Sequence, residues 1–268
     1  PQRESLIYTF FSEREVAKIP DVPKETPTQQ IEKAAVIGCG TMGGGIAMNF
    51  LNVGIPVKSL EMNQEALDRG FGVIKKNYDI QVQRGRMTAD EVDQRMALLS
   101  GTTEYEELKD ADVIIEAIYE IIDVKVEAFQ KMEAVAKPGA ILASNTSGLD
   151  IDKMAAATSR PEAVIGLHFF SPANVRKLLE VVRGKDTSKE TIASSMKLGK
   201  TLNKIAVLSG NAPGFIGNRM LAGYTRQAGE IILQGATPYQ VDNVLLQFGM
   251  PMGPFQMNDF TFRFYIQK

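Results

Sequence analysis

A cluster of glycines near position 40 restricts the folds open to this chain more than any other feature. The residues Gly38-Cys39-Gly40-Thr41-Met42-Gly43 follow a short apolar run at 34–38 and precede a run of helical period at 42–53. A second strand-like run at 55–60 comes next and ends at Glu61. A strand, a glycine-rich turn, a helix and a second strand form a βαβ unit, whose two strands are parallel. The sequence therefore predicts a parallel sheet that contains this unit.

The spacing of the glycines, G-x-G-x-x-G, also predicts a ligand for the turn. In this pattern Gly38 permits a tight turn, Gly40 lets the backbone approach a pyrophosphate, and Gly43 lets helix and sheet pack closely. The N-terminus of the following helix adds unpaired N–H donors and the positive end of the helix dipole. The alternative is a glycine turn without a ligand. The residues of this turn that we expect to bind a dinucleotide are Gly38, Gly40, Thr41, Met42 and Gly43.

Glu61 indicates which dinucleotide the turn takes. It closes the second strand 18 residues after Gly43, where the dinucleotide-binding pattern has an acidic residue. A carboxylate there accepts hydrogen bonds from both hydroxyls of a ribose and repels a 2′-phosphate. Met62 and Asn63 follow it, so these positions add no arginine that would reverse the preference. We therefore expect NAD rather than NADP as the cofactor.

Beyond this unit the pattern alternates between helices and strands up to about residue 210, and after Pro213-Gly214 it is helical only. Strands are expected at 113–117, 141–144, 164–170 and 178–182. Helices are expected at 64–86, 88–99, 124–136, 151–158 and 189–202. The fold class is therefore α/β, a Rossmann-type doubly wound sheet followed by the start of an all-helical C-terminal domain.

The chain divides into three parts on this interpretation. Residues 1–30 contain a helix at 6–19 and a linker with three prolines, which we expect to be stiff and extended. Residues 31–210 form the NAD-binding Rossmann-like domain. Residues 211–268 form a helical C-terminal domain for substrate binding or dimerisation.

Charge and residue counts exclude several classes of function. With 30 Lys and Arg against 32 Asp and Glu, the chain has no electrostatic reason to bind nucleic acid. No stretch approaches the ~18 apolar residues of a membrane helix, and the N-terminus lacks the order of a secretion signal. The single cysteine excludes an intramolecular disulfide and fits a reducing compartment. One His and one Cys cannot form a Cys/His zinc site, and we expect no metal.

The only histidine, His168, is the candidate catalytic base. It lies at the carboxyl end of a predicted strand, the edge where open α/β sheets bind ligands. Glu180 follows 12 residues later, across a proline-containing loop that can return its carboxylate to the imidazole. Ser147 follows another strand end, and Asn218 opens the first helix of the helical segment. Such groups near a nicotinamide suit alcohol oxidation, while a packed core histidine is the alternative.

Five segments carry a resemblance to a known family: G-C-G-T-M-G-G-G-I-A, D-A-D-V-I-I-E-A-I-Y-E, A-S-N-T-S, G-L-H-F-F-S-P and A-P-G-F-I-G-N-R. From about residue 31 to residue 253 the chain resembles the L-3-hydroxyacyl-CoA dehydrogenases of fatty-acid β-oxidation. The H-F-F-S-P-A form and the Y-T-F-F-S-E-R leader are similar to the multifunctional enzymes of this family. In those enzymes an enoyl-CoA hydratase/isomerase part precedes the dehydrogenase part.

The resemblance implies NAD-dependent oxidation of an L-3-hydroxyacyl-CoA to a 3-ketoacyl-CoA. It implies His168 as the general base with Glu180 as its partner, while Ser147 and Asn218 hold the substrate oxygen and the histidine. Glu61 would bind the adenosine ribose. It further implies that the NAD site is lined by Glu120, Lys125 and Asn145. The positive side chains that it places near the CoA phosphates, which a solvated helix face also explains, are Lys75, Lys76, Arg84 and Arg86.

The C-terminal part departs from the family pattern, because the helical domain starts at Phe215 and the tail at 260–268 does not resemble its continuation. We therefore expect a truncated helical domain. The implied partners are an acyl-CoA, an upstream hydratase/isomerase domain and, as one arrangement, a second copy of the chain. The implied location is the bacterial cytoplasm or the peroxisome. The alternatives are a β-hydroxyacid dehydrogenase that acts on a free acid with a lysine base, and a non-catalytic NAD-binding relative or fragment.

Overall fold

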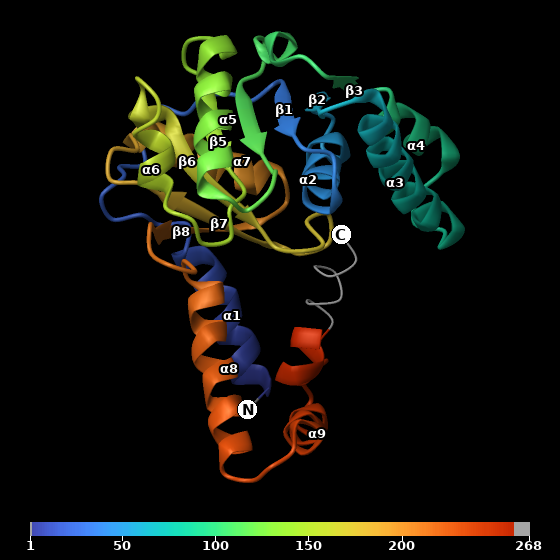
Figure 1. Ribbon diagram of the computed structural model, residues 1–268, viewed down its shortest axis with the longest axis vertical. Helices are drawn as coiled ribbons and strands as arrows, with labels where there is room; N and C mark the ends of the chain where they lie inside the picture. The colour runs from blue at the N-terminus through green and yellow to red at the C-terminus, as the bar shows by residue number, and fades with distance from the viewer. Residues whose placement is uncertain (1, 260–268) are drawn as a thin grey trace. The chain divides into compact units, whose positions relative to one another are not determined.

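The computed structural model describes residues 2–259 (Figure 1). The predicted tail at 260–268 lies outside the described residues. The chain divides into two compact units, Pro1–Phe215 and Ile216–Lys268, and each is described by itself.

The first unit is built on one mostly parallel sheet. Its strands lie in the order β3-β2-β1-β4-β5-β6-β7-β8, and every neighbouring pair is parallel except β6 and β7. Because β1 sits between β2 and β4, the chain order reverses there, and this is the point where open α/β sheets bind ligands. The strand bounds are β1 Ala34–Ile37, β2 Val57–Leu60, β3 Leu99–Thr102, β4 Val113–Glu116, β5 Ile141–Ser144, β6 Val164–Phe169, β7 Leu178–Arg183 and β8 Ile205–Gly210.

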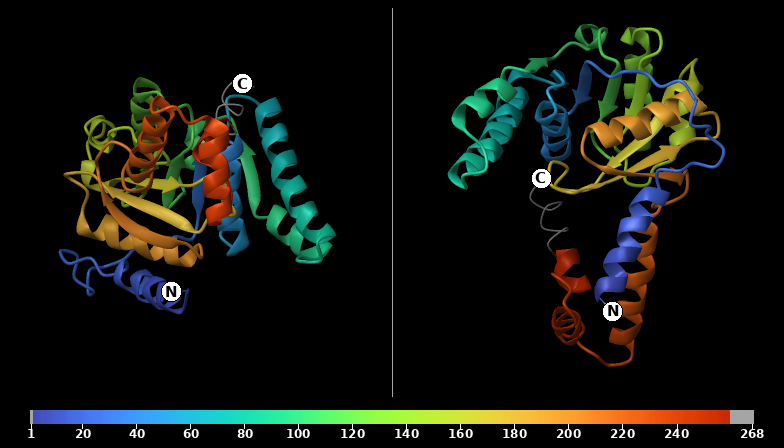
Figure 2. Two further views of the ribbon diagram at one scale, coloured as in Figure 1. Left: turned by 90° about the horizontal axis from the view of Figure 1, so that it is seen from below. Right: turned by 180° about the vertical axis from the view of Figure 1, so that it is seen from behind.

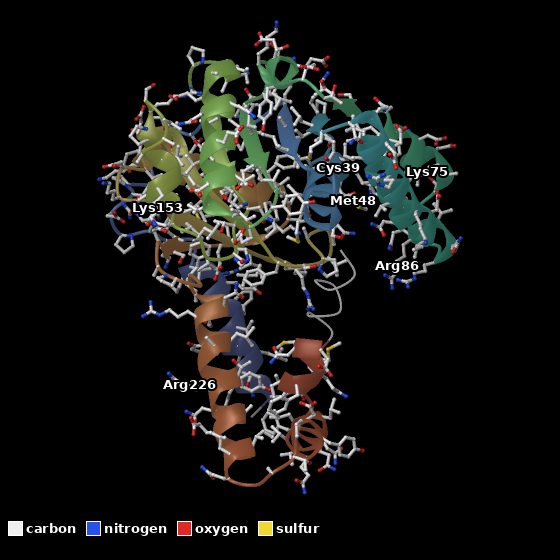
Figure 3. All side chains as sticks on the ribbon, viewed as in Figure 1. Cys39, Met48, Lys75, Arg86, Lys153 and Arg226 are labelled. Atoms are coloured by element: carbon white, nitrogen blue, oxygen red, sulfur yellow. The ribbon has the colours of Figure 1, made fainter. Side chains whose placement is uncertain are left out.

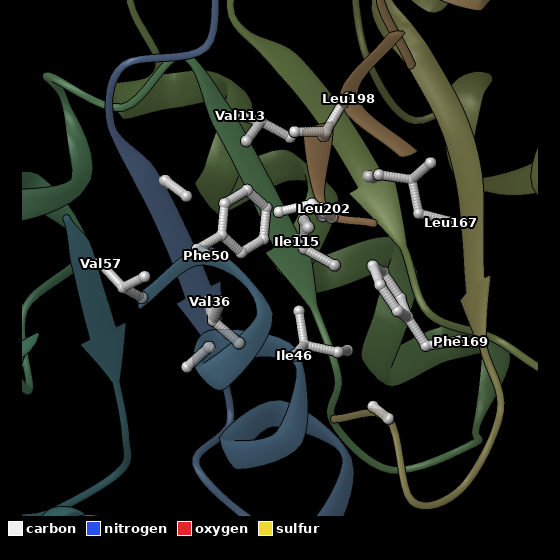
Figure 4. Close-up of a cluster of buried hydrophobic side chains, with 14 of the residues drawn as sticks. Val36, Ile46, Phe50, Val57, Val113, Ile115, Leu167, Phe169, Leu198 and Leu202 are labelled. Atoms are coloured by element: carbon white, nitrogen blue, oxygen red, sulfur yellow. The ribbon is translucent and has the colours of Figure 1, made fainter. Parts of the chain in front are cut away.

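Helices cover both faces of this sheet (Figures 1 and 2). Side chains alternate between the faces of a strand, so Val36 joins the apolar core on one face and Ile37 the core on the other. The first core is completed by helices α2, α3, α4 and α7, and Figure 4 shows part of it, with Ile46 and Phe50 packed over the strands. The second core is completed by α5 and α6. The bounds are α2 Thr41–Asn52, α3 Gln64–Gln83, α4 Ala89–Met96, α5 Ile122–Val135, α6 Ile151–Ala155 and α7 Lys189–Thr201, with short 3-10 turns at Tyr105–Leu108 and Pro161–Ala163.

The N-terminal segment forms helix α1, Gln2–Glu15, followed by an extended linker. The helix contains no buried residue and starts and ends about one turn earlier than the range 6–19 predicts. The linker contacts α7 and β7: the Arg183 guanidinium donates to Asp21 at 2.7 Å, and the Gln29 amide donates to the Ser194 hydroxyl at 2.8 Å. In Figure 2, seen from behind, the linker crosses this part of the unit.

The second unit contains helices α8, Gly217–Leu233, and α9, Pro238–Phe248. Helix α9 starts with a capping box, in which Thr237 and Gln240 each satisfy a backbone N–H group of the other. It ends at Gly249, which has a φ of 108°. The buried carboxylate of Asp242 accepts hydrogen bonds from the amides of Phe255 and Gln256, which fixes the turn after α9.

The described residues contain no helix with the length and apolar character needed to cross a membrane. Over the same part of the chain, no group of three or more His, Cys, Asp or Glu side chains is placed to hold a metal ion.

Candidate active site

The glycine turn lies between β1 and α2, at the carboxyl edge of the sheet. Gly38 has a φ of +90°, and a Cβ there would meet the Ala117 carbonyl oxygen at 2.9 Å. A Cβ at Gly43 would lie 1.7 Å from the Gly38 carbonyl oxygen, so only glycine lets α2 approach the turn. A Cβ at Gly40 would meet nothing within 4 Å, and this residue caps α2 without a side-chain hydrogen bond. The turn thus offers open space in front of backbone donors, which fits a pyrophosphate.

Glu61 lies beside this turn. Its Oε1 accepts a hydrogen bond from the Cys39 amide at 2.6 Å, and its Oε2 accepts from the Met62 amide at 3.1 Å. The carboxylate is therefore held at the end of β2, one strand away from the pyrophosphate-type turn, as the adenosine ribose of a dinucleotide requires. Burial raises the pKa of the Cys39 thiol to about 11, so this thiol stays protonated and unreactive at neutral pH.

His168 and Glu180 lie directly opposite each other in the antiparallel pair of β6 and β7. Facing residues of such a pair point to the same side of the sheet, and the Nδ1 atom of His168 lies 2.7 Å from the Oε2 atom of Glu180. Both side chains are buried, 5% and 1% exposed. The imidazole also packs against the rings of Phe170 and Phe215, with centroids 4.4 and 5.8 Å away. A carboxylate on Nδ1 keeps the proton there and leaves Nε2 as a base.

Glu120 connects the two loops next to the glycine turn. Its Oε1 accepts hydrogen bonds from the Thr146 hydroxyl at 2.6 Å, the Ser147 amide at 2.7 Å and the Ser147 hydroxyl at 3.0 Å. Burial acts to raise the pKa of Glu120, but these hydrogen bonds and the charge of Lys125 outweigh it and hold the pKa below its usual value. Glu120 is therefore a charged acceptor that fixes the predicted substrate serine.

Lys125 is buried rather than open to the edge of the sheet. Its side chain is 1% exposed, and its Nζ atom lies 2.7 Å from Glu116 and 3.4 Å from Glu120. Glu116, which closes β4 in D-A-D-V-I-I-E-A, is not among the site residues predicted from the sequence. An acidic residue at the end of an apolar strand is the sequence signal that could have indicated Glu116. Only the fold shows that this residue is buried beside a lysine.

Asn145 links the ends of two neighbouring strands, because its Oδ1 atom accepts a hydrogen bond from the Phe169 amide at 2.9 Å. The glycine turn, Glu61, Glu120, Asn145 and Ser147 lie on loops or strand ends of the first unit, and His168 and Glu180 lie within its paired strands β6 and β7. Asn218 lies in the first turn of α8, in the second unit.

The four basic residues predicted near the CoA phosphates are exposed and lie on α3 or the turn after it. Figure 3 labels two of them, Lys75 and Arg86. Lys75 forms an i,i+4 ion pair with Asp79 at 2.9 Å. The four positive charges thus lie on α3 and on the turn that follows it. Their role with CoA stays a prediction.

The first unit has the features that define an NAD-binding oxidoreductase. These are a Rossmann-type sheet, a glycine turn without a side-chain cap, an acidic residue after β2 and a buried His–Glu pair. The model of the 3-hydroxyacyl-CoA dehydrogenase NAD-binding domain matches residues 33–212, and that of the C-terminal domain of the same enzymes matches residues 214–261. The chain belongs to the 3-hydroxyacyl-CoA dehydrogenase family, and its cofactor is NAD.

Two relatives and two solved structures give the context of this match. The chain is 42% identical to a peroxisomal bifunctional enzyme of Danio rerio and 40% identical to the peroxisomal fatty acid beta-oxidation multifunctional protein MFP2 of Arabidopsis thaliana. Each alignment covers 96% of this chain, but the chain spans only 36% and 35% of those relatives. M. tuberculosis FadB2 (TM-score 0.83, 36% identity) and the (S)-3-hydroxybutyryl-CoA dehydrogenase PaaH1 of Ralstonia eutropha (0.84, 34%) each match 87% of this chain and 83% of their own.

These findings confirm the predicted family, fold class and cofactor. The relatives also confirm the resemblance to the dehydrogenase part of multifunctional β-oxidation enzymes. The roles of the individual site residues stay predictions.

Proposed function

We propose that this chain is the dehydrogenase part of a multifunctional β-oxidation enzyme and oxidises L-3-hydroxyacyl-CoA to 3-ketoacyl-CoA. The observation that carries the proposal is the buried pair of His168 and Glu180, 2.7 Å apart, at the carboxyl edge of an NAD-binding sheet. The family match and the relatives named for fatty acid beta-oxidation support the substrate class.

In this proposal His168 accepts the proton of the C3 hydroxyl at its Nε2 atom. Glu180, hydrogen-bonded at Nδ1, keeps the ring oriented and stabilises the imidazolium that forms. NAD, when bound, supplies the acceptor for the hydride that leaves C3. Reduction of a 3-ketoacyl-CoA reverses the proton transfer, and the imidazolium then returns its proton to the oxygen.

The remaining predicted residues bind and orient. The glycine turn holds the pyrophosphate, Glu61 the adenosine ribose, and Glu120 and Asn145 line the NAD site, with Lys125 buried behind Glu120. Ser147 and Asn218 hold the substrate oxygen and the histidine. The exposed positive side chains on and after α3 attract the CoA phosphates, as charged surface groups do at low salt.

The relatives also support two proposals about the longer protein. An enoyl-CoA hydratase/isomerase part belongs in it, because the curated relatives are multifunctional and are almost three times as long as the matched segment. A peroxisomal location follows the names of the same relatives.

A binding titration followed by a turnover assay tests this function. NADH fluorescence is first titrated with the protein, and NADH oxidation is then measured with acetoacetyl-CoA and with free acetoacetate. The proposal predicts NADH binding and oxidation that requires acetoacetyl-CoA. Oxidation with free acetoacetate alone would indicate a free-acid dehydrogenase. Binding without turnover on either substrate would indicate a non-catalytic NAD-binding relative.

A further inference from the structure

Glu116 is a buried carboxylate that the proposed reaction does not use. It ends β4, it is fully buried, and both of its oxygens accept hydrogen bonds from the Lys125 ammonium, at 2.9 and 2.7 Å. The Ser144 hydroxyl, at the end of β5, also donates to it, and so does the Ile118 amide at 3.2 Å. Glu116 thus joins the ends of two neighbouring strands to the first turns of α5.

Lys125 carries this connection outward to the site. Its ammonium lies between two carboxylates, the fully buried Glu116 and Glu120, whose side chain is 38% exposed. Glu120 in turn holds the amide and hydroxyl of Ser147 and the hydroxyl of Thr146. A continuous chain of polar contacts therefore runs from Glu116 through Lys125 and Glu120 to Ser147.

The charges explain why the buried end of this chain is needed. A lysine that is 1% exposed loses its hydration, so its charge needs carboxylate partners in place of the water. Glu120 alone lies 3.4 Å away and is also bound by three donors on Oε1. Without Glu116, Lys125 would have to take Glu120 as its only carboxylate partner and draw it away from Ser147.

We propose that Glu116 is a positioning residue of the NAD site, which acts through Lys125 to hold Glu120 and Ser147 in place. The inference rests on the proposed function, because it assumes that Glu120, held from behind by Lys125, lines the NAD site. It adds a residue that touches neither cofactor nor substrate but sets the geometry of those that do.

The test is a double-mutant cycle on NADH affinity. E116Q keeps the shape and hydrogen-bonding capacity of the side chain but removes its charge, and K125M removes the ammonium. Each single substitution is expected to weaken NADH binding about tenfold, the usual effect of losing one hydrogen bond to a charged group. Because Glu116 acts through Lys125, the double variant E116Q/K125M is also expected to lose about tenfold, not the hundredfold of two independent effects.

E133Q is the matched control. Glu133 is a carboxylate on the same helix, α5. It accepts hydrogen bonds from the amide and hydroxyl of Ser159 and not from the residues of the glycine turn. Its substitution is expected to leave NADH affinity unchanged. The double variant contains no unpaired buried charge, so it keeps the proposal falsifiable even where E116Q alone unfolds: NADH binding weaker than that of K125M would contradict the positioning role.

The outcomes separate this inference from the proposed function. If the unchanged chain binds NADH and E116Q binds it equally well, or if the two losses add to a hundredfold, the positioning role is wrong and the proposed function stands. If the unchanged chain binds no NADH, the proposed function is wrong and the inference falls with it.

Discussion

Within the described residues, the imidazole of His168 contacts one carboxylate, Glu180, and the aromatic rings of Phe170 and Phe215. A buried imidazole without a carboxylate would have to take up a proton in apolar surroundings, which is costly. In the proposed reaction, Glu180 removes that cost when the proton arrives. At the residue scale, we therefore propose that the pair acts as a single acid–base unit and not as two separate groups.

Substitution of Glu180 tests this unit. E180Q keeps a hydrogen bond to Nδ1 but removes the charge that stabilises the imidazolium, and it is expected to lower kcat for acetoacetyl-CoA reduction about a hundredfold. NADH affinity is expected to change less than about twofold, because Glu180 lies on β7 and not in the glycine turn. Steady-state kinetics and NADH titration measure both. The control is E190Q, an exposed carboxylate at the start of α7, and an equal loss in both variants would contradict the account.

The limits of sequence reasoning are clearest at single residues. The spacing of His168 and Glu180 indicated that the loop between them can return the carboxylate to the imidazole, and the two side chains lie 2.7 Å apart because two strands joined by a turn bring facing residues together. Glu116 escaped prediction, because its importance comes from burial beside Lys125, and these residues meet only once α5 packs on the sheet. Sequence periodicity reports which faces are apolar, but it does not report which charge is buried.

At the scale of elements, the contact between the glycine turn and α2 decides whether the cofactor site forms. G43A places a Cβ 1.7 Å from the Gly38 carbonyl oxygen, so the helix must move away from the turn. We expect a loss of about 2 kcal/mol or more in the free energy of unfolding, together with loss of NADH binding. Urea unfolding and NADH titration measure the two effects.

G72A is the matched control for this substitution. Gly72 is exposed on α3, and a Cβ there meets nothing within 4 Å. Because alanine favours helix by up to about 1 kcal/mol over glycine, this variant is expected to be as stable as the unchanged chain or more stable. A G43A variant as stable as G72A would show that the close approach of helix and turn is not required.

Asp112 fixes the chain where it enters β1. Its Oδ2 atom accepts hydrogen bonds from the amides of Glu32 and Lys33, and its Oδ1 atom lies 2.6 Å from the Lys137 ammonium. Burial acts to raise the pKa of Asp112, but Lys137 and the two amides outweigh it and lower the pKa below its usual value. The folded state therefore gains stability from this carboxylate above the unfolded-state pKa of about 3.9 and loses it as the pH falls through the lower folded-state pKa.

D112N makes this dependence measurable. We expect it to reduce the free energy of unfolding by about 1–2 kcal/mol at pH 7 and by progressively less below about pH 4. Chemical unfolding over this pH range measures the difference from the unchanged chain, with D110N, an exposed neighbour, as the control. A cost that stays constant down to pH 2 would contradict the assignment of the effect to the Asp112 charge.

Most elements lie close to their predicted ranges, but two strands were missed. The βαβ unit and the helix that starts with a glycine turn appear within one or two residues of the predicted ranges. Strand β3, Leu99–Thr102, was missed because its four residues show no apolar alternation and two of them are exposed. Strand β8 was also missed, because its place beside β7 depends on pairing with residues far away in the sequence.

At the scale of the whole molecule, the first unit holds both the cofactor elements and the His168–Glu180 pair, and the second unit holds Asn218. The predicted stiffness of the linker has a physical basis beyond its prolines, because Asp21, Thr28 and Gln29 are tied to β7 and α7. The His168–Glu180 pair and the glycine turn are separate parts of the first unit. We therefore expect that a substitution can abolish the proton transfer without changing the binding of NAD.

The most direct test of the account is a comparison of the unchanged chain with H168Q in two assays, NADH titration and acetoacetyl-CoA-dependent NADH oxidation. The account predicts an NADH dissociation constant that changes less than about twofold, because His168 lies outside the glycine turn, and a turnover rate that falls by at least about a hundredfold. Turnover retained in H168Q would contradict the central claim, because the sequence contains no other histidine to act as the base.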